Sequence, residues 1–568
     1  MGRARSYATG KLILTSSKVF KLSTIAATVL AATTANAALY TVVEVSPEGI
    51  SSGEYVEVQG VAIEPGNKQG AVLGCFSNSC SSNEYKLAGE TRRTVDGVSY
   101  REEAPFAMDR GFSRIQDYDD FKYYCYRELL YSTCETWADE HWAPWNAEKN
   151  GSTTSNALAF VEGGAYTNKF NNVINSLTEA GLPVGNRSIA GGTRNEIVSP
   201  FTTATSDWKQ GRSWAVIADS GHNYGVGSIA RSASNNEGTH HTSKAAIWRN
   251  DDAPVELNWG SGGIAKDGEL LAQGSMRDIV IEGTGNIYSV GYNTFGEDNY
   301  YDASIFISTT STYSTAGGWE TKRISGAESR ISGETIHSNS VATGINDNLL
   351  VVGTAKRSGY YPQNGAAGNL IFVSDASSSS PSASFLQNIT AANHMFFSGA
   401  GGKAGAVNNY NEIVGQVDAE DTRENNGKPR RLRGFIYPHN LNGQFEKRRA
   451  IFNNKAQYLD NLTNDEIVSG NVNNQYRIID ATDINDAGVI SATAIKCSGG
   501  YDNTTHNSYC GGGSQIEETV AVKLVPIAGR TSANIQPRGV EEPTVERQGG
   551  SIGWAMFALF GLLGFRRK

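Results

Sequence analysis

The chain contains a repeat, and its clearest copy reads Ala342-Thr343-Gly344-Ile345-Asn346-Asp347 and continues to Val351-Val352-Gly353. A second copy runs from Ala404 to Gly415, and a third runs from Ala481 to Ala492. Two weaker copies precede them and end at Gly227 and Gly291. The closing residues are therefore 64, 62, 62 and 77 residues apart. So steady a period indicates an architecture of repeated structural units.

Each copy predicts a hairpin followed by a further strand. The Asn and Asp of the Ile-Asn-Asp segment are turn residues, because they tolerate left-handed backbone and bond their own main chain. We interpret the closing glycine as the point where the strand leaves the sheet. The next apolar strand carries an aromatic residue at 248, 306, 372 and 437. Strand, turn, aromatic strand and linker within ~60 residues are typical of one antiparallel blade of a propeller.

The sequence therefore predicts an all-β fold, a β-propeller of roughly six to eight antiparallel blades over residues 38–525. Glycine makes up 63 of the 568 residues, which suits a protein dense in turns. An open array of blades would leave two unpaired edges. We therefore expect the strands Tyr40–Val45 and Thr519–Val525 to share one blade and close the ring.

The segment at about 75–185 departs from the repeat, and we expect a helical insertion there, pinned by disulfides, on the propeller. Helix is expected over 117–148, where turn residues are scarce. A second helix is expected over Asn171–Ala180, with Gly181 as its stop signal. Residues 526–548 are polar and contain three prolines, so we expect a flexible linker.

The N-terminus predicts export. Residues 1–37 contain five cations and no acid, then an apolar run and Ala35-Asn36-Ala37. This order predicts a signal peptide that signal peptidase cleaves between Ala37 and Ala38. The alternative is an N-terminal anchor, but the apolar run is shorter than the ~20 residues that a spanning helix needs.

The C-terminus predicts a sorting tail over 549–568. It begins with Gly549-Gly550-Ser551, continues without charge to Phe565 and ends in Arg566-Arg567-Lys568. We interpret the apolar stretch as a short hydrophobic helix that holds the chain transiently in the inner membrane before cleavage. A permanent C-terminal anchor is the alternative.

Two features resemble known families. The order of Gly549-Gly550-Ser551, apolar helix and basic cluster resembles the GlyGly-CTERM signal of Gram-negative bacteria. That resemblance implies a rhombosortase-like protease that cuts near the glycines, and passage of the protein to the cell surface or the medium. The repeats resemble HAF repeats of exported bacterial proteins. The whole arrangement is similar to an uncharacterised exported family known only as a domain of unknown function, and it implies an architecture without an activity.

Charge and cysteine content agree with export. The formal net charge is −9, and loss of the eight cations of the two end segments takes it to −17. Such an acidic chain is repelled by phosphates, which excludes nucleic acid as a partner. The six cysteines suit an oxidising compartment, and their proximity favours the disulfides Cys75–Cys80, Cys125–Cys134 and Cys497–Cys510. Zinc is the alternative, but no pair has C-x-x-C spacing.

The sequence contains no motif that identifies a catalytic residue, a cofactor site or a metal site. The strongest binding candidate is an aromatic cluster, because exposed aromatic rings suit sugars and peptides; its tryptophans are Trp137, Trp142 and Trp145. The alternative is a small core beneath the insertion. Two acidic groups could bind calcium or form solvated loops; they are Asp117, Asp119 and Asp120, and Asp418, Glu420 and Asp421.

These observations favour an exported cell-envelope or surface protein that binds an unknown glycan or protein ligand, or acts as a scaffold, more than they favour an enzyme. The alternative is a secreted hydrolase of glycans or peptides. A convergent group of titratable side chains in the propeller channel would distinguish the two, and paired carboxylates can be far apart in sequence.

Overall fold

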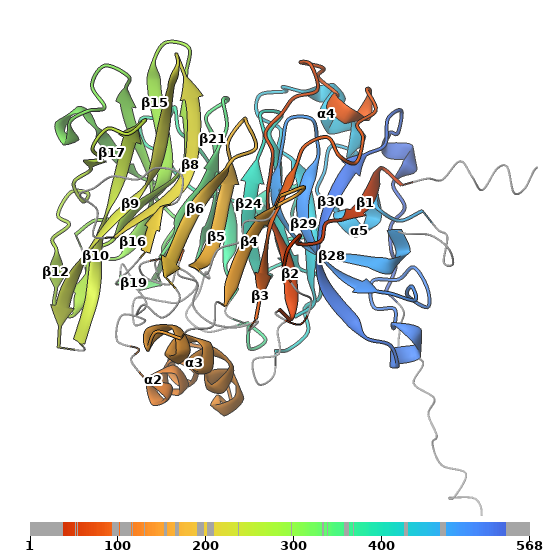
Figure 1. Cartoon of the computed structure of the whole chain (residues 1–568), viewed down its shortest axis with the longest axis horizontal. Coiled ribbons are helices and arrows are strands. Elements are labelled where there is room, and N and C mark those ends of the chain that lie inside the picture. Colours follow the sequence, from red (N-terminus) through yellow and green to blue (C-terminus); the bar gives the residue numbers. More distant parts are fainter. Residues whose placement is uncertain are drawn as a thin grey trace, which may run out of the picture.

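The structure is a computed structural model. It describes residues 38–540 except 51–52, 54, 94–100, 103–114, 116, 130, 153–155, 165–169, 190–197, 201–209, 237, 297, 332–333, 338, 357–362, 367, 425–429 and 466–472. Within these residues, seven antiparallel sheets stand side by side as the blades of a β-propeller (Figure 1). The predicted fold is thereby confirmed. The predicted tail helix over 549–568 lies outside the described residues.

The blades follow one another in chain order, from the inner strand outward in each. The first two blades are β2 (Glu57–Ile63), β3 (Leu87–Arg92) and β4 (Ala157–Val161), then β5 (Phe170–Leu177), β6 (Pro183–Ile189) and β7 (Val198–Pro200). The third and fourth are β8 (Gly211–Asp219), β9 (His222–Asn235), β10 (Gly238–Arg249) and β11 (Val255–Glu256), then β14 (Gly274–Ile281), β15 (Asn286–Thr294), β16 (Tyr301–Thr309) and β17 (Glu320–Arg323). The fifth and sixth are β20 (Val341–Ile345), β21 (Leu350–Ala355), β22 (Leu370–Asp375) and β23 (Ser384–Phe385), then β24 (Gly402–Val407), β25 (Glu412–Asp418), β26 (Leu432–Pro438) and β27 (Gln457–Tyr458).

The last blade closes the ring by combining three strands from the C-terminal end of the chain with one strand from the N-terminal end. It consists of β28 (Tyr476–Ile484), β29 (Ile490–Cys497), β30 (Glu517–Pro526) and, at its outer edge, β1 (Tyr40–Glu44). The register of β1 on β30 runs from Tyr40 opposite Pro526 to Glu44 opposite Val522. The expectation that the two end strands share a blade is confirmed. Two small hairpins complete the described strands: β12 (Lys266–Asp267) with β13 (Leu270–Leu271), and β18 (Ser329–Ile331) with β19 (Glu334–His337).

The repeated glycine lies in the middle of its strand, which corrects our interpretation of it as a strand end. Gly227, Gly291, Gly353 and Gly415 each lie opposite a β-bulge of the inner strand. At Gly291 an added Cβ would lie 2.0 Å from the Ser275 carbonyl oxygen. The bulge brings that carbonyl toward the neighbouring strand, so a side chain has no room. Ala492 takes this place in the seventh blade.

The repeated asparagine joins each turn to the next blade. Asn346 Oδ1 accepts the backbone N–H of Leu350 at 3.0 Å, which closes its own turn, while its Nδ2 donates to the Asn408 carbonyl at 2.8 Å. Asn408 donates in the same way to the Asn485 carbonyl, and Asn485 donates to Glu64 of the first blade. An Asn at this position therefore stabilises both its own hairpin and the contact between blades.

The hydrophobic core lies between neighbouring blades. One cluster joins Val414 and Ile436 of the sixth blade to Ile478 and Val520 of the seventh. The aromatic residues at the repeated positions are all buried; they are Trp248, Phe306, Phe372 and Tyr437.

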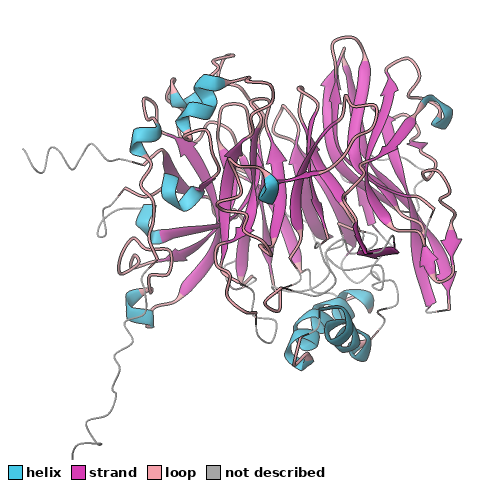
Figure 2. Ribbon diagram, turned by 180° about the vertical axis from the view of Figure 1, so that it is seen from behind, coloured by secondary structure: helices cyan, strands magenta, loops and turns pink. Residues whose placement is uncertain are grey.

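The helical segment covers fewer residues than the insertion that we expected over 75–185. It consists of α2 (Tyr118–Tyr124), a π turn (Cys125–Leu129) and α3 (Glu135–Lys149), all within the connection between β3 and β4. These helices lie against one end of the propeller (Figure 2). The Tyr131 hydroxyl donates to Glu424 of the sixth blade at 2.9 Å. Two further helices, α4 (Glu446–Ile451) and α5 (Leu459–Leu462), are short.

The second predicted helix, over Asn171–Ala180, is wrong, because this segment is strand β5. It pairs with β6 and buries Val173, Ile174 and Leu177. The β-branched residues Val173 and Ile174 favour a strand, and Gly181 at φ +68° belongs to the turn that leads into β6.

The predicted linker over 526–548 is also wrong in its first part. Pro526 ends β30, and Arg538 is 5% exposed. The Arg538 guanidinium donates to the carbonyls of Asp460 and Thr504 and to the side chain of Asn474. These bonds fix the segment on the last two blades, because a buried arginine needs acceptors for its N–H groups.

Candidate functional site

A cavity of about 720 Å³ occupies the central channel. The inner strands of all seven blades line it, namely β2, β5, β8, β14, β20, β24 and β28. Each inner strand contributes a few residues, so the cavity wall is assembled from segments that are far apart in the sequence. This is the place where a propeller can present several blades to one ligand.

Most charged side chains of the channel are paired with one another. Glu90 of β3 is fully buried and forms ion pairs with Arg92 and Arg101. Burial alone would raise the pKa of Glu90, but the two arginines together lower it. On the opposite wall, Arg277 of β14 forms an ion pair with Glu102. These pairs satisfy the charges within the protein.

Arg277 also stacks on an aromatic side chain. Its guanidinium carbon lies 3.5 Å from the centre of the Trp214 ring of β8. The half-buried Trp214 is thus held between the third and fourth blades at the channel wall. A desolvated guanidinium over an indole is a strong cation–π contact.

The acidic groups considered for calcium have other partners. Asp418 and Asp421 both form ion pairs with the buried Arg430, at 3.1 and 3.2 Å, and Glu420 pairs with Arg431. In the other group, Asp117 and Asp120 form a capping box at the start of α2, and Asp119 pairs with Lys122. Within the described part of the chain, no group of three or more His, Cys, Asp or Glu side chains is arranged to hold a metal ion.

Asp278 and Asp483 are channel aspartates that join neighbouring blades. Asp278 Oδ2 accepts the N–H of Ile345 in the next blade at 2.9 Å, and Asp483 Oδ2 accepts the N–H of Ile63 at 2.9 Å. Each also accepts the N–H of the residue that follows it. Burial raises the pKa of Asp278 to about 7 and that of Asp483 to about 6.

The sequence did contain a signal for these two aspartates. Each aspartate stands immediately before the apolar residue that precedes the turn in its copy of the repeat. Two other copies have Gly344 and Ala406 at the position of the aspartate. Lining up the copies would have placed all four residues on the channel wall. It would not have shown that the carboxylates accept backbone N–H groups of the next blade.

We expect the stability that Asp278 contributes to fall as the pH rises from about 4 to about 7. The pKa of Asp278 is about 7 in the folded chain. The folded chain therefore keeps a proton that the unfolded chain has already released, and stability is lost as that proton dissociates. Asp483 acts in the same direction.

Urea unfolding at pH 5 and pH 8 should show a smaller pH dependence of the unfolding free energy for Asp278→Asn than for the native chain. The exposed Asp251→Asn should keep the native dependence, and an equal change in both variants would contradict this assignment.

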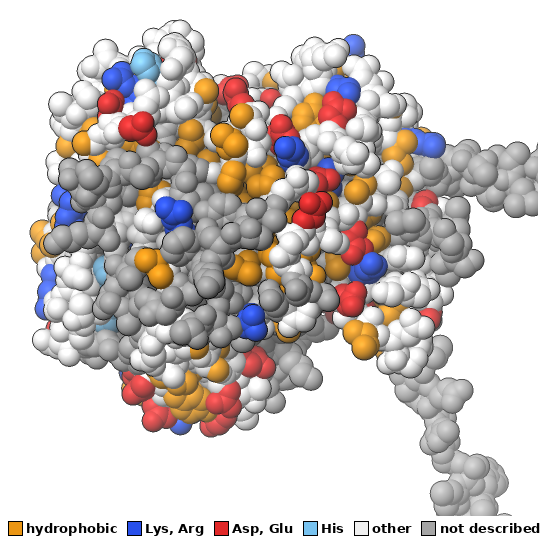
Figure 3. Space-filling view, viewed as in Figure 1, with side chains coloured by type: hydrophobic (Ala, Val, Ile, Leu, Met, Phe, Trp, Pro, Cys, Tyr) orange, Lys and Arg blue, Asp and Glu red, His pale blue; other side chains and the backbone are white. Residues whose placement is uncertain are grey.

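The three tryptophans proposed for ligand binding form the core of the helical segment. Trp137 and Trp145 are each 9% exposed, and Trp142 packs against them with partial exposure. Trp137 stacks on His141 at 4.0 Å between ring centres. Tyr123 lies at the surface of the same segment with 59% exposure. Figure 3 shows acidic side chains beside hydrophobic ones on this outer surface.

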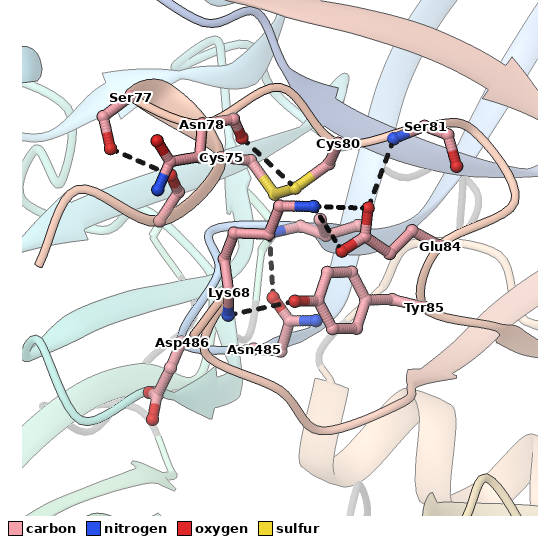
Figure 4. Close-up of a disulfide and its surroundings, with 12 residues drawn as sticks. Lys68, Cys75, Ser77, Asn78, Cys80, Ser81, Glu84, Tyr85, Asn485 and Asp486 are labelled. Atoms are coloured by element: carbon pink, nitrogen blue, oxygen red, sulfur yellow. Dashed lines mark hydrogen bonds and ion pairs between the residues drawn. A yellow bond between two sulfur atoms is a disulfide. The ribbon is translucent and has the colours of Figure 1, made fainter. Parts of the chain in front are cut away.

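The six cysteines form the three local disulfides that proximity favoured, Cys75–Cys80, Cys125–Cys134 and Cys497–Cys510. The first holds the loop between β2 and β3 over the Asn485 turn of the last blade (Figure 4). There the Cys75 N–H donates to the Ala487 carbonyl at 2.9 Å. Of the processing residues, Ala38 is described and buried, whereas Ala37, Gly549, Gly550 and Ser551 lie outside the described residues. None of the helices among the described residues combines the length and the apolar character of a membrane-spanning segment.

The fold and the channel define a seven-bladed β-propeller protein whose central channel contains several internal ion pairs. The chain belongs to the family described as "Protein of unknown function (DUF3466)", whose model matches residues 231–568. This match confirms the expectation that the chain contains an uncharacterised domain. No curated protein matches the sequence.

Solved structures with some likeness include an α-L-arabinanase and a putative glycosidase. One is an α-L-arabinanase of Cellvibrio cellulosa complexed with arabinohexaose, at 13% identity and a TM-score of 0.20, covering 40% of this chain and 73% of the arabinanase. Another is a putative glycosidase from Bacteroides thetaiotaomicron, at 9% identity and a TM-score of 0.25, covering 56% of this chain and 88% of that one. These likenesses are too low to indicate an activity for this chain.

Proposed function

We propose that this protein is an exported binding protein of the cell envelope or cell surface, and that its ligand occupies the central channel. The observation that carries the proposal is the cavity of about 720 Å³ on which the inner strands of all seven blades converge. A ligand of drug or oligosaccharide size fits such a volume.

Two observations support export. The three disulfides suit an oxidising compartment. Ala38 and Leu39 are buried, and the Leu39 N–H donates to the Leu462 carbonyl at 2.8 Å. The packed fold thus includes the residue that would begin the mature chain after signal peptidase.

The channel carboxylates favour binding over hydrolysis. A hydrolase acting on glycans needs one carboxyl group that protonates the substrate and another that is free to attack or to activate water. In the channel, Asp278 and Asp483 are the candidates, since burial holds their pKa values near neutral pH. Both oxygens of each already accept a backbone N–H, one from the next blade and one from the residue that follows the aspartate. A structural role therefore accounts for them.

Filling the channel tests the proposed binding site. Thr343 lines the cavity from β20, so Thr343→Trp should occupy ligand space and abolish binding of any ligand identified in a thermal-shift screen of glycans, peptides and small metabolites. The exposed Thr315→Trp on the fourth blade is the matched control and should bind normally. Full binding by Thr343→Trp would refute a channel site. Conversion of a ligand, abolished by Asp278→Asn and Asp483→Asn, would instead establish the hydrolase.

Processing at both ends is expected in native cells. Intact-mass analysis of the mature protein should show a chain that starts at Ala38 and lacks the segment beyond Gly549-Gly550. The small-x-small site and the glycine-bounded tail motivate this prediction. A mature surface protein that still carries Arg566 to Lys568 would contradict removal of the tail.

A further inference from the structure

Two neighbouring residues of the connection between β3 and β4 lie across the opening of the channel. Arg101 donates to Glu90 of the first blade and, at 2.8 Å, to the Asn175 side chain of the second. The next residue, Glu102, accepts a hydrogen bond from Arg277 of the fourth blade. Both residues line the cavity. Consecutive Cα atoms are about 3.8 Å apart, so a pair of residues that reaches three blades lies between those blades and not along the wall of one.

The helical segment of the same connection reaches a further part of the ring. The Tyr131 hydroxyl donates at 2.9 Å to Glu424, which lies in the loop between β25 and β26 of the sixth blade. Figure 1 shows α2 and α3 beneath the strands at this end of the propeller. The contacts with the first, second, fourth and sixth blades therefore place the described part of this connection over one end of the channel.

The contacts that hold this connection on the ring are polar. Arg101, Glu102 and Tyr131 are joined to the blades by ion pairs and hydrogen bonds. Among the described residues, the hydrophobic core of the helical segment, which includes Phe121 and Trp137, contains no residue of a blade. Polar groups that separate form hydrogen bonds with water, so a polar interface opens at a smaller cost than an apolar one. The connection can therefore move while the blades stay folded.

The arginine of the Glu102–Arg277 ion pair is the fixed partner. Its guanidinium carbon lies 3.5 Å from the centre of the Trp214 ring and 5.1 Å from the centre of the Tyr292 ring. Cation–π contacts with two rings hold the guanidinium in place when the carboxylate leaves. The Glu102 side chain is 17% exposed, against 3% for Arg277, so water already reaches it. Glu102 is therefore the partner that moves, and it returns to an arginine that has kept its position.

We propose that Arg101, Glu102 and the helices within residues 118–149 form a cap on one end of the channel, and that the Glu102–Arg277 ion pair holds this cap closed. A ligand enters and leaves the cavity when the pair opens. The cap rests on the proposed binding function, because it controls access to that same site.

The rate at which a thiol in the cavity is labelled tests the cap without a ligand. Ala406 lines the cavity from β24 and is partly buried. All six native cysteines form disulfides, so Ala406→Cys introduces one free thiol. Labelling by N-ethylmaleimide should be slow in this variant and fast in the exposed Thr315→Cys. Equally fast labelling of the two thiols would show that the cavity is open without movement of the cap, and would overturn the proposal.

Adding Glu102→Gln to Ala406→Cys tests the ion pair. The labelling rate should rise about tenfold, because it follows the population of the open state and a charge-assisted hydrogen bond is replaced by a neutral one. The matched control is Glu256→Gln, which removes the charge from the Arg231–Glu256 pair on the third blade and should leave the rate unchanged. An unchanged rate with Glu102→Gln, or an equal rise with Glu256→Gln, would overturn the proposal.

A second variant keeps the test valid if Glu102→Gln fails to fold. Tyr131→Phe keeps the ring and removes the hydroxyl that contacts the sixth blade, so it should also raise the labelling rate at Ala406→Cys several-fold. A native rate in Tyr131→Phe would then overturn the cap. Melting temperatures of the variants should stay native, because the propeller blades are untouched. A rise in rate that accompanies a lowered melting temperature would indicate a loosened propeller and would count against the cap.

The cap and the proposed function can fail separately. If the labelling rate depends on Glu102 but no ligand is found whose binding Thr343→Trp abolishes, the cap stands and the channel binding site is wrong. If the labelling rate does not depend on Glu102 while Thr343→Trp abolishes binding of a ligand, the cap is wrong and the channel binding site stands.

Discussion

Gly227→Ala is expected to destabilise the propeller by about 3 kcal/mol, at the upper end of what overpacking costs. Gly227 lies in β9 opposite the bulge of β8 between Ser213 and Ala215. A Cβ at this position would lie 1.8 Å from the Arg212 carbonyl oxygen. Because the clash is with backbone, relief requires a shift of a whole strand. Denaturant unfolding followed by circular dichroism should show a markedly lower midpoint.

The control for this prediction is Gly283→Ala. Gly283 has no heavy atom within 4 Å of an added Cβ and does not have a positive φ. Its substitution should change the stability by no more than about 0.5 kcal/mol. Equal midpoints for the two variants would show that β8 can move away from a side chain, as the seventh blade does at Ala492, and that the bulge does not explain the repeated glycine.

Arg448→Met is expected to cost about 3–5 kcal/mol, the range found when a buried ion pair loses one partner. Arg448 of α4 and Glu412 of β25 are both fully buried, and the guanidinium donates to the two carboxylate oxygens at 2.6 and 2.9 Å. Arg448 also donates to the carbonyls of Val72 and Asp486, so it links three blades. The variant leaves a carboxylate without a counterion in the protein interior.

Two further variants distinguish the cost of leaving a buried carboxylate without a counterion from the cost of removing any arginine side chain. Arg231→Met removes a cation that is 55% exposed in its pair with Glu256, and it should cost less than about 1 kcal/mol. Adding Glu412→Gln to Arg448→Met removes the unpaired charge and should restore a large part of the stability. Thermal and urea unfolding of the four proteins measure these differences. An unrestored double variant would indicate that the carbonyl contacts, and not the ion pair, carry the effect.

The sequence predicted what depends on local spacing. The repeat and its turn residues predicted the blades, because hairpins are encoded within a few neighbouring residues. The apolar strands at the two ends predicted the closure of the ring, which the pairing of Tyr40 with Pro526 confirms. The short spans between cysteines predicted the three disulfides. The prediction failed at Asn171–Ala180. The glycine that follows this segment was interpreted as the end of a helix, but the segment pairs with β6 and is a strand.

The tertiary structure alone decided the candidate site and the reason for the repeated glycine. Trp214, Arg277 and Thr343 share one cavity because three inner strands face the same axis, and no local pattern shows which residue of a bulged strand points there. Glu412 meets Arg448 through the packing of α4, 36 residues further along the chain. Periodicity and turn chemistry act between neighbours in the sequence, so they determine blades and their order. Burial, ion pairing and the shape of a channel depend on distances between blades, which exist only after the ring has closed.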